Sequence, residues 1–325
     1  MPTAQSPLGW LGVYSEANLR AALRSATPDL ADLPITLHRL PDLDNANWAS
    51  CRATVGARVF AKFAFSERTA VRIWREAQVL GVLDADLGLA VPKLVAANRN
   101  PAFVATELVD GGVPLTYADV VAAVPDRVAG LATHLASFLA RLHAPHALAR
   151  LREEVDSLLP LPQQGLHVST EQLRARFIAM IEPRQRAMVG RWCDWVDGQL
   201  ATSAETVFVH GDLHPYNQLW DLEEARLLAV IDFEGSGVAE PEFDFRVLPV
   251  FGQGVDLLVS TVERYEALTA RKVSLSRVMA HHLLNYLGDA LWRTEAGLPL
   301  PEPGDSPSAY VAEASVRMAA LGISP

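Results

Sequence analysis

The sequence has little cysteine, no long uncharged apolar run and no excess of basic charge, and each shortage excludes a class of protein. Cys51 and Cys193 are the only cysteines among 325 residues. Two are too few for a disulfide framework and indicate a reducing compartment. No apolar run approaches the roughly 20 residues of a membrane-spanning helix. The N-terminus, MPTAQSPLGW, lacks the basic and apolar regions of a secretory signal. We therefore expect a cytoplasmic protein with no membrane partner.

The charge balance excludes one class of ligand. The chain carries 28 basic and 38 acidic residues, which gives a formal net charge of −10. A nucleic-acid-binding groove needs a clustered positive field, so nucleic acid is excluded as the main partner. The acidic excess is compatible with a cationic ligand, although many enzymes are acidic for solubility alone.

The first third of the chain predicts a small sheet with one long helix. Five stretches have the alternation or the bounding turns of strands: Ile35–Leu40, Cys51–Val55, Arg58–Phe65, Val91–Ala97 and Phe103–Leu108. Glu67–Leu83 has a helical period with its apolar residues on one face. We expect these elements to form an N-terminal nucleotide-binding lobe, residues 1–109, with an antiparallel sheet. Gly111–Gly112 marks a flexible crossing out of it.

The remaining residues, 110–325, are predicted to be mainly helical. Helical patterns cover Pro125–His143, Glu171–Val196 and most of the chain after Val255, with a β-rich interruption at Val207–Ile231. The whole pattern predicts an α+β fold of two lobes, the second of them larger. We expect a monomer or a weak dimer.

Polar side chains follow two apolar strands inside Val207–Phe245. His210–Gly211–Asp212 comes directly after one strand, and Asn217 lies five residues beyond Asp212. Asp232–Phe233–Glu234 comes directly after the other, and a short hairpin between them would bring Asn217 and Asp232 together. The order matches the kinase pattern H-x-D-x-x-x-x-N followed by D-F-x.

Phosphoryl transfer to a hydroxyl requires these residue types. Mg²⁺ neutralises the triphosphate and prefers hard oxygen ligands, which Asn217 and Asp232 offer. A carboxylate must orient the acceptor hydroxyl and take its proton, and Asp212 fits that role. The alternative is that these residues form only a turn, a cap and a strand end.

The motifs HGDLHPYN, IDFE and PEFDFR resemble those of the aminoglycoside phosphotransferase family of small-molecule antibiotic and metabolite kinases. The resemblance covers nearly the whole chain. It implies a protein-kinase-like fold, ATP or GTP with Mg²⁺, and direct transfer to a small-molecule acceptor. By motif, it implies that Asp212 is the catalytic base and that Asn217 and Asp232 are the magnesium ligands. Gly211 stands where protein kinases carry an arginine, and no activation segment follows Phe233, so a protein kinase is disfavoured.

The first lobe would supply the nucleotide contacts. Lys62 on the third strand is expected to contact the phosphates, with Glu76 on the following helix holding it in place. The segment LPDLDNANWASCRA contains no glycine, so the usual phosphate-covering loop is absent, and residues 47–50, ending at Ser50, would lie over the phosphates. The nucleotide base should meet the backbone of a hinge that contains Thr106, Glu107 and Leu108.

The acceptor is the least constrained part of the prediction. We expect a cationic, hydroxyl-bearing molecule such as an antibiotic, held by polar side chains of the second lobe: Asp256, Glu263, Glu266, His282, Asn285 and Asp289. A kinase for homoserine, choline or a sugar remains an alternative, as does a catalytically silent nucleotide-binding protein. Asp244 is predicted to be a scaffold residue, and His143 a capping or surface residue.

Overall fold

A five-stranded antiparallel sheet forms the first lobe. Its order is β1-β2-β3-β5-β4, and its strands are β1 (Ile35–Leu37), β2 (Cys51–Val55), β3 (Val59–Phe63), β4 (Leu94–Arg99) and β5 (Ala102–Glu107). This computed structural model describes residues 7–38, 50–85, 87–116, 119, 122, 125–156, 158, 160–161, 168–202, 204–250, 255–300 and 305–324. The predicted first strand extends to Leu40, and residues 39–40 lie outside the described residues.

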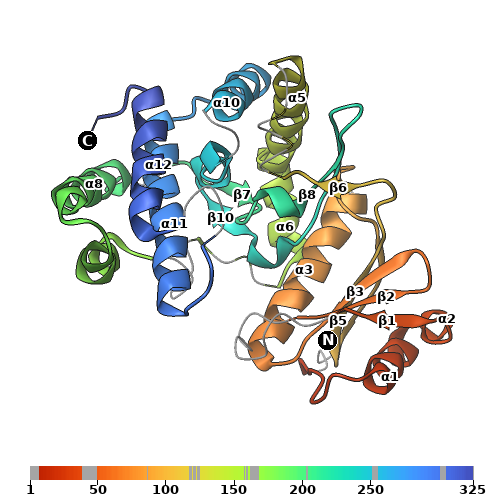
Figure 1. Cartoon of the computed structure of the whole chain (residues 1–325). Helices are drawn as coiled ribbons and strands as arrows, with labels where there is room; N and C mark the ends of the chain where they lie inside the picture. The colour runs from red at the N-terminus through yellow and green to blue at the C-terminus, as the bar shows by residue number, and fades with distance from the viewer. Residues whose placement is uncertain are drawn as a thin grey trace.

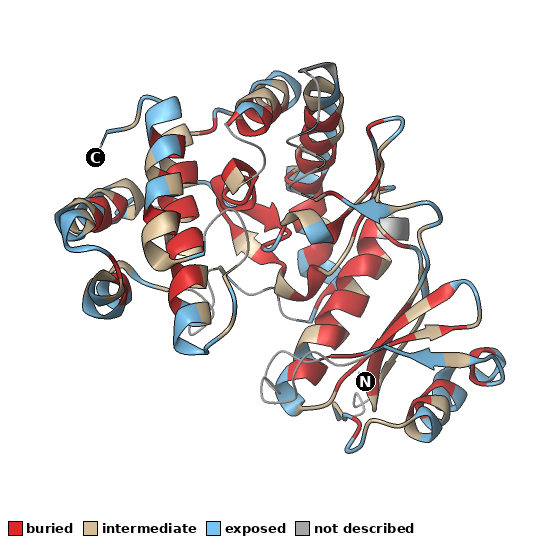
Figure 2. Ribbon diagram, in the orientation of Figure 1, coloured by how far each residue is buried: buried red, intermediate tan, exposed pale blue. Residues whose placement is uncertain are grey.

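Helices cover both faces of this sheet. On one face, α1 (Glu16–Ala26) and α2 (Pro28–Ala31) enclose an apolar cluster with alternate residues of β2 and β3. Ser15 caps α1 by accepting a hydrogen bond from Asn18 N at 3.2 Å. On the other face runs α3 (Glu67–Ala85), which is buried along most of its length between the sheet and the second lobe (Figures 1 and 2). The predicted small sheet with its long helix is confirmed.

The second lobe is mainly helical, as predicted (Figure 1). Its helices are α5 (Pro125–Leu142), α6 (Pro145–Glu154), α7 (Thr170–Gln172), α8 (Pro183–Leu200), α9 (Glu242–Phe245), α10 (Asp256–Thr269), α11 (Leu275–Glu295) and α12 (Pro307–Ala320). Helix α10 packs along α5, and α11 packs against α8 and α12. Among the helices described, none is both long enough and apolar enough to cross a bilayer.

The motif region lies in two small β-sheets. In one, β7 (Val207–Val209) pairs with β10 (Gly237–Ala239). In the other, β6 (Val113–Pro114), β8 (Gln218–Asp221) and β9 (Arg226–Val230) form a three-stranded sheet. The hairpin predicted between the two acidic motifs is therefore present as β8 and β9. The division of the chain after residue 109 stays a prediction.

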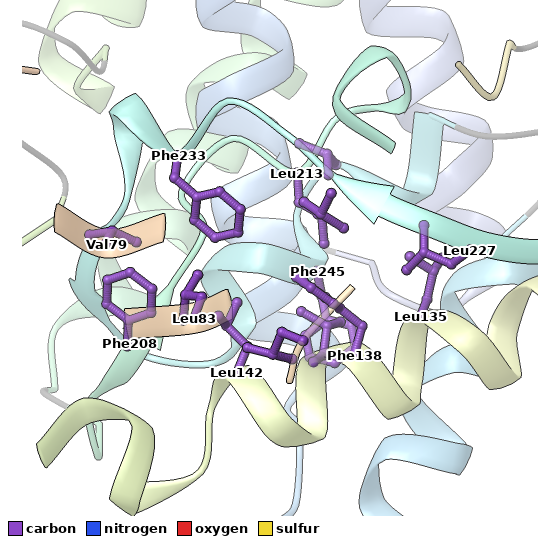
Figure 3. Close-up of a cluster of buried hydrophobic side chains, with 14 of the residues drawn as sticks. Val79, Leu83, Leu135, Phe138, Leu142, Phe208, Leu213, Leu227, Phe233 and Phe245 are labelled. Carbon is purple, nitrogen blue, oxygen red and sulfur yellow. The ribbon is translucent and has the colours of Figure 1, made fainter. Parts of the chain in front are cut away.

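The second lobe's core fixes the loops that follow these strands. Leu213, after β7, and Phe233, after β9, both point into one buried apolar cluster (Figure 3). Phe208 and Phe245 belong to the same cluster, and Val79 of α3 joins it from the first lobe. Because each polar motif carries a buried apolar neighbour, the core holds both motifs in place.

The amphipathic segment predicted over Glu171–Val196, for which Pro183 offered a break, is interrupted before that proline. After α7, residues Leu173–Phe177 form a π-helical turn and Ile178–Met180 a 3₁₀ turn, and a regular helix resumes at Pro183. Proline has no N–H to donate and is favoured at the first position of a helix. The apolar periodicity continues through the break, so Pro183 was the one sign of it in the sequence.

Candidate active site

The loop His210–Gly211–Asp212 is fixed by a buried carboxylate. Asp244 on α9 accepts hydrogen bonds from the backbone N–H groups of His210 and Gly211, both at 2.8 Å. His143 adds a third contact, with its Nε2 3.1 Å from Oδ2 of Asp244. Burial would raise the pKa of Asp244, but His143 and the backbone donors lower it below its usual value. Asp244 is thus placed as a scaffold residue, while the expectation that His143 caps a helix or lies on the surface is wrong, because its side chain is fully buried.

Gly211 allows the tight turn that this loop makes. Its φ is +82°, in the region that residues with a side chain rarely adopt. A Cβ at this position would lie 2.4 Å from the carbonyl oxygen of Gly235. The arginine that protein kinases carry here therefore has neither the backbone conformation nor the space it needs.

Asp212 is exposed at the end of this loop. Its side chain is 51% exposed, and its Oδ2 lies 3.5 Å from Nε2 of His214. Asn217 is buried, and its Nδ2 donates to the backbone oxygen of Asp212 at 2.8 Å. This bond holds the Asn217 amide against the loop through its nitrogen, and the amide oxygen accepts no hydrogen bond from the residues that the structure describes.

Asp232 lies on a neighbouring loop in an unusual conformation. The residue has φ 68° and ψ 60°, the left-handed region, which costs energy for a residue with a side chain and is concentrated at functional sites. Its loop is tied to that of Asp212, because Ile231 N donates to the backbone oxygen of Asn217 at 2.9 Å. The two acidic motifs are therefore joined directly through their backbones.

Lys62 connects these motifs to the first lobe. Its Nζ donates to both carboxylate oxygens of Glu76 at 2.9 Å and to Oδ1 of Asp232 at 2.9 Å. Burial alone would lower the pKa of Lys62, but Asp232, Glu76 and Glu234 together raise it. Burial would likewise raise the pKa of Asp232, but Lys62 and Arg52 hold it well below its usual range. Both groups are therefore charged at neutral pH.

Glu234 is a further buried acid at this site, and we gave it no role from the sequence. Its Oε1 lies 3.2 Å from Nζ of Lys62, and its Oε2 lies 3.0 Å from Arg72 of α3. Its backbone oxygen accepts a hydrogen bond from Arg75, also on α3. Glu76 accepts from the backbone N–H of Phe233 at 3.1 Å. These contacts fasten α3 to the loop that carries Asp232.

Backbone groups of the hinge residues hydrogen-bond to neighbouring strands and loops. The N–H groups of Glu107 and Leu108 donate to Lys93 O at 2.9 Å and to Arg58 O at 2.7 Å. Outside the strand ladders of the described chain, no backbone hydrogen bond is made by the carbonyl of Glu107 or by the N–H of Val109. The Thr106 side chain is half-buried, and those of Glu107 and Leu108 are exposed. Ser50 is buried at the start of β2, and residues 47–49 lie outside the described residues.

The residues predicted to contact the acceptor fall on two helices. On α10, which packs along α5 (Figure 1), Asp256 and Glu263 are exposed, and Glu266 is paired with Lys272 at 2.6 Å. On α11, Asp289 is paired with Arg293 at 2.8 Å, and Asn285 is half-buried. Their contact with an acceptor stays a prediction.

His282 on α11 is the most enclosed of these candidates. The side chain is fully buried, and its Nδ1 lies 2.8 Å from Arg246 O. Burial, together with nearby Arg317, lowers the pKa of His282 to about 3. The ring is therefore neutral at physiological pH and contacts the protein interior.

Comparisons with known proteins agree with this geometry. The model of the phosphotransferase enzyme family (APH) matches residues 19–275, whereas no curated protein sequence matches the chain. A GDP complex of a variant aminoglycoside 2'-phosphotransferase-IIIa has a TM-score of 0.67 at 17% identity, covering 93% of this chain and 95% of that one. Macrolide 2'-phosphotransferase type I has a TM-score of 0.57 at 22% identity, covering 94% and 99%. A gentamicin complex of APH(2")-IIa has a TM-score of 0.57 at 17% identity, covering 96% and 100%.

The structural likeness establishes the fold, and the family match covers most of the chain and includes every motif residue described above. The chain therefore belongs to the phosphotransferase enzyme family and is a kinase that acts on hydroxyl groups.

Proposed function

We propose that the enzyme transfers the γ-phosphoryl group of ATP or GTP to a hydroxyl of a small, cationic molecule, with Asp212 as the base. The observation that carries this proposal is the meeting of Lys62, Glu76 and Asp232 within hydrogen-bonding distance, beside a loop that exposes Asp212. Asp212 would orient the acceptor hydroxyl and receive its proton. Lys62, held by Glu76, would contact the phosphates. Transfer of labelled γ-phosphate to a panel of hydroxyl-bearing molecules tests the proposal.

The nucleotide base would be bound by the hinge backbone. The carbonyl of Glu107 and the N–H of Val109 are two hinge groups that make no hydrogen bond outside the strand ladders of the described chain. One acceptor and one donor at this spacing can bind the hydrogen-bonding edge of a purine. Recognition by backbone groups accommodates either purine, so the proposal keeps both ATP and GTP.

The site's side chains fit a magnesium ion. Glu76, Asp232 and Glu234 each place a carboxylate oxygen within 4.8 Å of the others. Glu76 and Glu234 are buried and occupied by Lys62 and Arg72, whereas Asp232 is 25% exposed. Asp232 and the amide oxygen of Asn217 would therefore hold the ion. When bound, Mg²⁺ would neutralise charge on the transferring phosphoryl group.

We expect Asp232→Asn to raise the Mg²⁺ concentration needed for half-maximal activity and to lower kcat. The substitution removes the negative charge that would bind the ion and that also pairs with Lys62. The measurement is a magnesium titration of the transfer rate, with Asp221→Asn in the β8–β9 hairpin as the matched control. A titration curve and a kcat equal to those of the unmodified enzyme would contradict the assignment.

Two observations support a cationic acceptor. The chain carries ten more acidic than basic residues, 38 against 28. Two structures with the same fold are described as an aminoglycoside 2'-phosphotransferase and a gentamicin complex. Because Glu266 and Asp289 are neutralised by Lys272 and Arg293, attraction of a cation would rest on the field of the whole protein more than on these side chains.

We expect kcat/KM for cationic acceptors to fall as salt increases. A tenfold rise in ionic strength shortens the Debye length about threefold, and steering of a cation towards an acidic protein weakens accordingly. Neutral acceptors of similar size are the control and should respond little. If a neutral or anionic acceptor surpasses every cationic one without any salt dependence, the acceptor is a metabolite of another class and the cationic proposal is wrong.

A further inference from the structure

Arg52 on β2 lies directly across the sheet from Lys62. The antiparallel register of β2 and β3 pairs these two residues, and paired residues of antiparallel strands extend their side chains on the same face. The alternate residues of both strands, including Cys51 and Ala53, face the apolar cluster under α1. Arg52 and Lys62 therefore share the face that looks towards Asp232.

Arg52 and Lys62 both contact Asp232, but the Arg52 side chain is more exposed. Its Nη2 lies 3.7 Å from Oδ2 of Asp232, whereas Lys62 holds the other oxygen, Oδ1, at 2.9 Å. The Arg52 side chain is 47% exposed, against 9% for Lys62. Among the described residues, Asp232 is the only ion-pair partner of Arg52. A long, weak and exposed ion pair contributes little to stability, so folding alone gives no reason for an arginine here.

The segment before β2 lacks the glycines of the usual phosphate-covering loop. No glycine occurs between Gly12 and Gly56, so the segment before β2 cannot form a glycine-rich loop whose backbone N–H groups approach phosphates closely. A guanidinium is an effective substitute, because it carries five N–H donors in a planar fork that matches a phosphate.

We propose that Arg52 is a phosphate-binding residue of the nucleotide site, a second cation beside Lys62 that compensates for the absence of a glycine-rich loop. This inference rests on the proposed nucleotide-dependent function. With a metal at Asp232, that carboxylate is neutralised and Arg52 loses its partner. The phosphates then provide the anion that the guanidinium binds, so the ion pair with Asp232 belongs to the nucleotide-free enzyme.

The test is nucleotide affinity by calorimetry, with a nucleoside and its mono-, di- and triphosphate in both the adenine and guanine series. Arg52→Gln should weaken triphosphate binding about 10- to 100-fold, the range of a charge-assisted hydrogen bond. The loss should shrink as phosphates are removed and vanish for the nucleoside. Arg52→Lys should restore part of the affinity. The effect should persist in an Asp232→Asn background, because it acts on phosphate rather than through Asp232.

Arg24→Gln is the matched control. Arg24 is 58% exposed and paired with Asp32 at 3.2 Å, but it lies on α1, on the opposite face of the sheet. Its loss should leave every affinity within twofold. Triphosphate affinity unchanged in Arg52→Gln, or an equal loss for the nucleoside, overturns the role of Arg52 alone. Failure of the unmodified enzyme to bind any nucleotide overturns the proposed function together with it.

Discussion

Asp212→Ala should reduce kcat by at least about 10³-fold while nucleotide affinity stays within a few-fold of the unmodified enzyme. Loss of a general base typically costs about 10²–10⁴ in rate, and loss of hydroxyl positioning adds to this cost. The side chain is 51% exposed and makes no contact with Lys62 or Glu76. Its removal should therefore spare both folding and the nucleotide contacts.

The measurement pairs single-turnover transfer with calorimetric nucleotide binding, so that chemistry and affinity are separated. Asp212→Asn keeps the size of the side chain and removes its basicity, and it should be nearly as inactive as Asp212→Ala. Glu224→Gln, an exposed carboxylate on the adjacent hairpin, is the control. A kcat for Asp212→Ala within a few-fold of the original would remove Asp212 from the mechanism.

Local patterns predicted the fold well because each strand or helix has a recognisable sequence pattern. Strand β2, beside Lys62, alternates between buried and more exposed residues, and the helix that carries Glu76 has a clear apolar face. Asp212, Asn217 and Asp232 could be selected because the kinase pattern fixes their spacing. The structure brings them together, since the Asn217 side chain donates to the backbone oxygen of Asp212 and Ile231 N donates to the backbone oxygen of Asn217. Their roles remain proposals.

Contacts between residues distant in sequence could not be predicted in the same way. Glu234 meets Arg72 and Arg75 across about 160 positions of the chain, and no local pattern marks an arginine on a helix as the partner of a later loop. His143 was misjudged for the same reason. Its position at the end of an amphipathic helix suggested a cap, whereas Asp244 and Tyr265 bury it through side-chain contacts at 3.1 Å. The position of Arg52 beside Lys62 follows only from the register of β2 and β3.

The long-range contacts are those expected of a kinase without an activation segment. In regulated kinases, the lysine–glutamate pair must be brought together by movement of the helix that carries the glutamate. Here α3 is bound to the Asp232 loop through Glu76, Arg72 and Arg75. Val79 and Leu83 of α3 pack in the second-lobe core beside Phe233 and Phe208 (Figure 3). In this structure the helix is fixed by charge and by apolar packing, and it holds Glu76 at Lys62.

Substitutions of Lys62 and Glu76 should therefore be strongly non-additive. Lys62→Met should lower kcat/KM by about 10²–10³-fold, because a phosphate loses its direct charge-assisted contact. Glu76→Gln should lower it by about 10–100-fold, because Asp232 and Glu234 would still hold Lys62 but draw it towards the metal ligand. The double variant should resemble Lys62→Met alone, since Glu76 acts by positioning Lys62. Contacting residues commonly show coupling of about 0.5–3 kcal/mol.

The double-mutant cycle needs a control on the same helix and a check of folding. Glu67→Gln changes an exposed carboxylate in the first turn of α3, and its effect should simply add to that of Lys62→Met. Glutamine at position 76 keeps an oxygen that can accept from Phe233 N, so the bond between α3 and the Asp232 loop is retained and thermal melting should show a folded protein. Additive losses in a folded double variant would mean that Glu76 acts independently of Lys62, and the lysine would then owe its position to Asp232 and Glu234 instead.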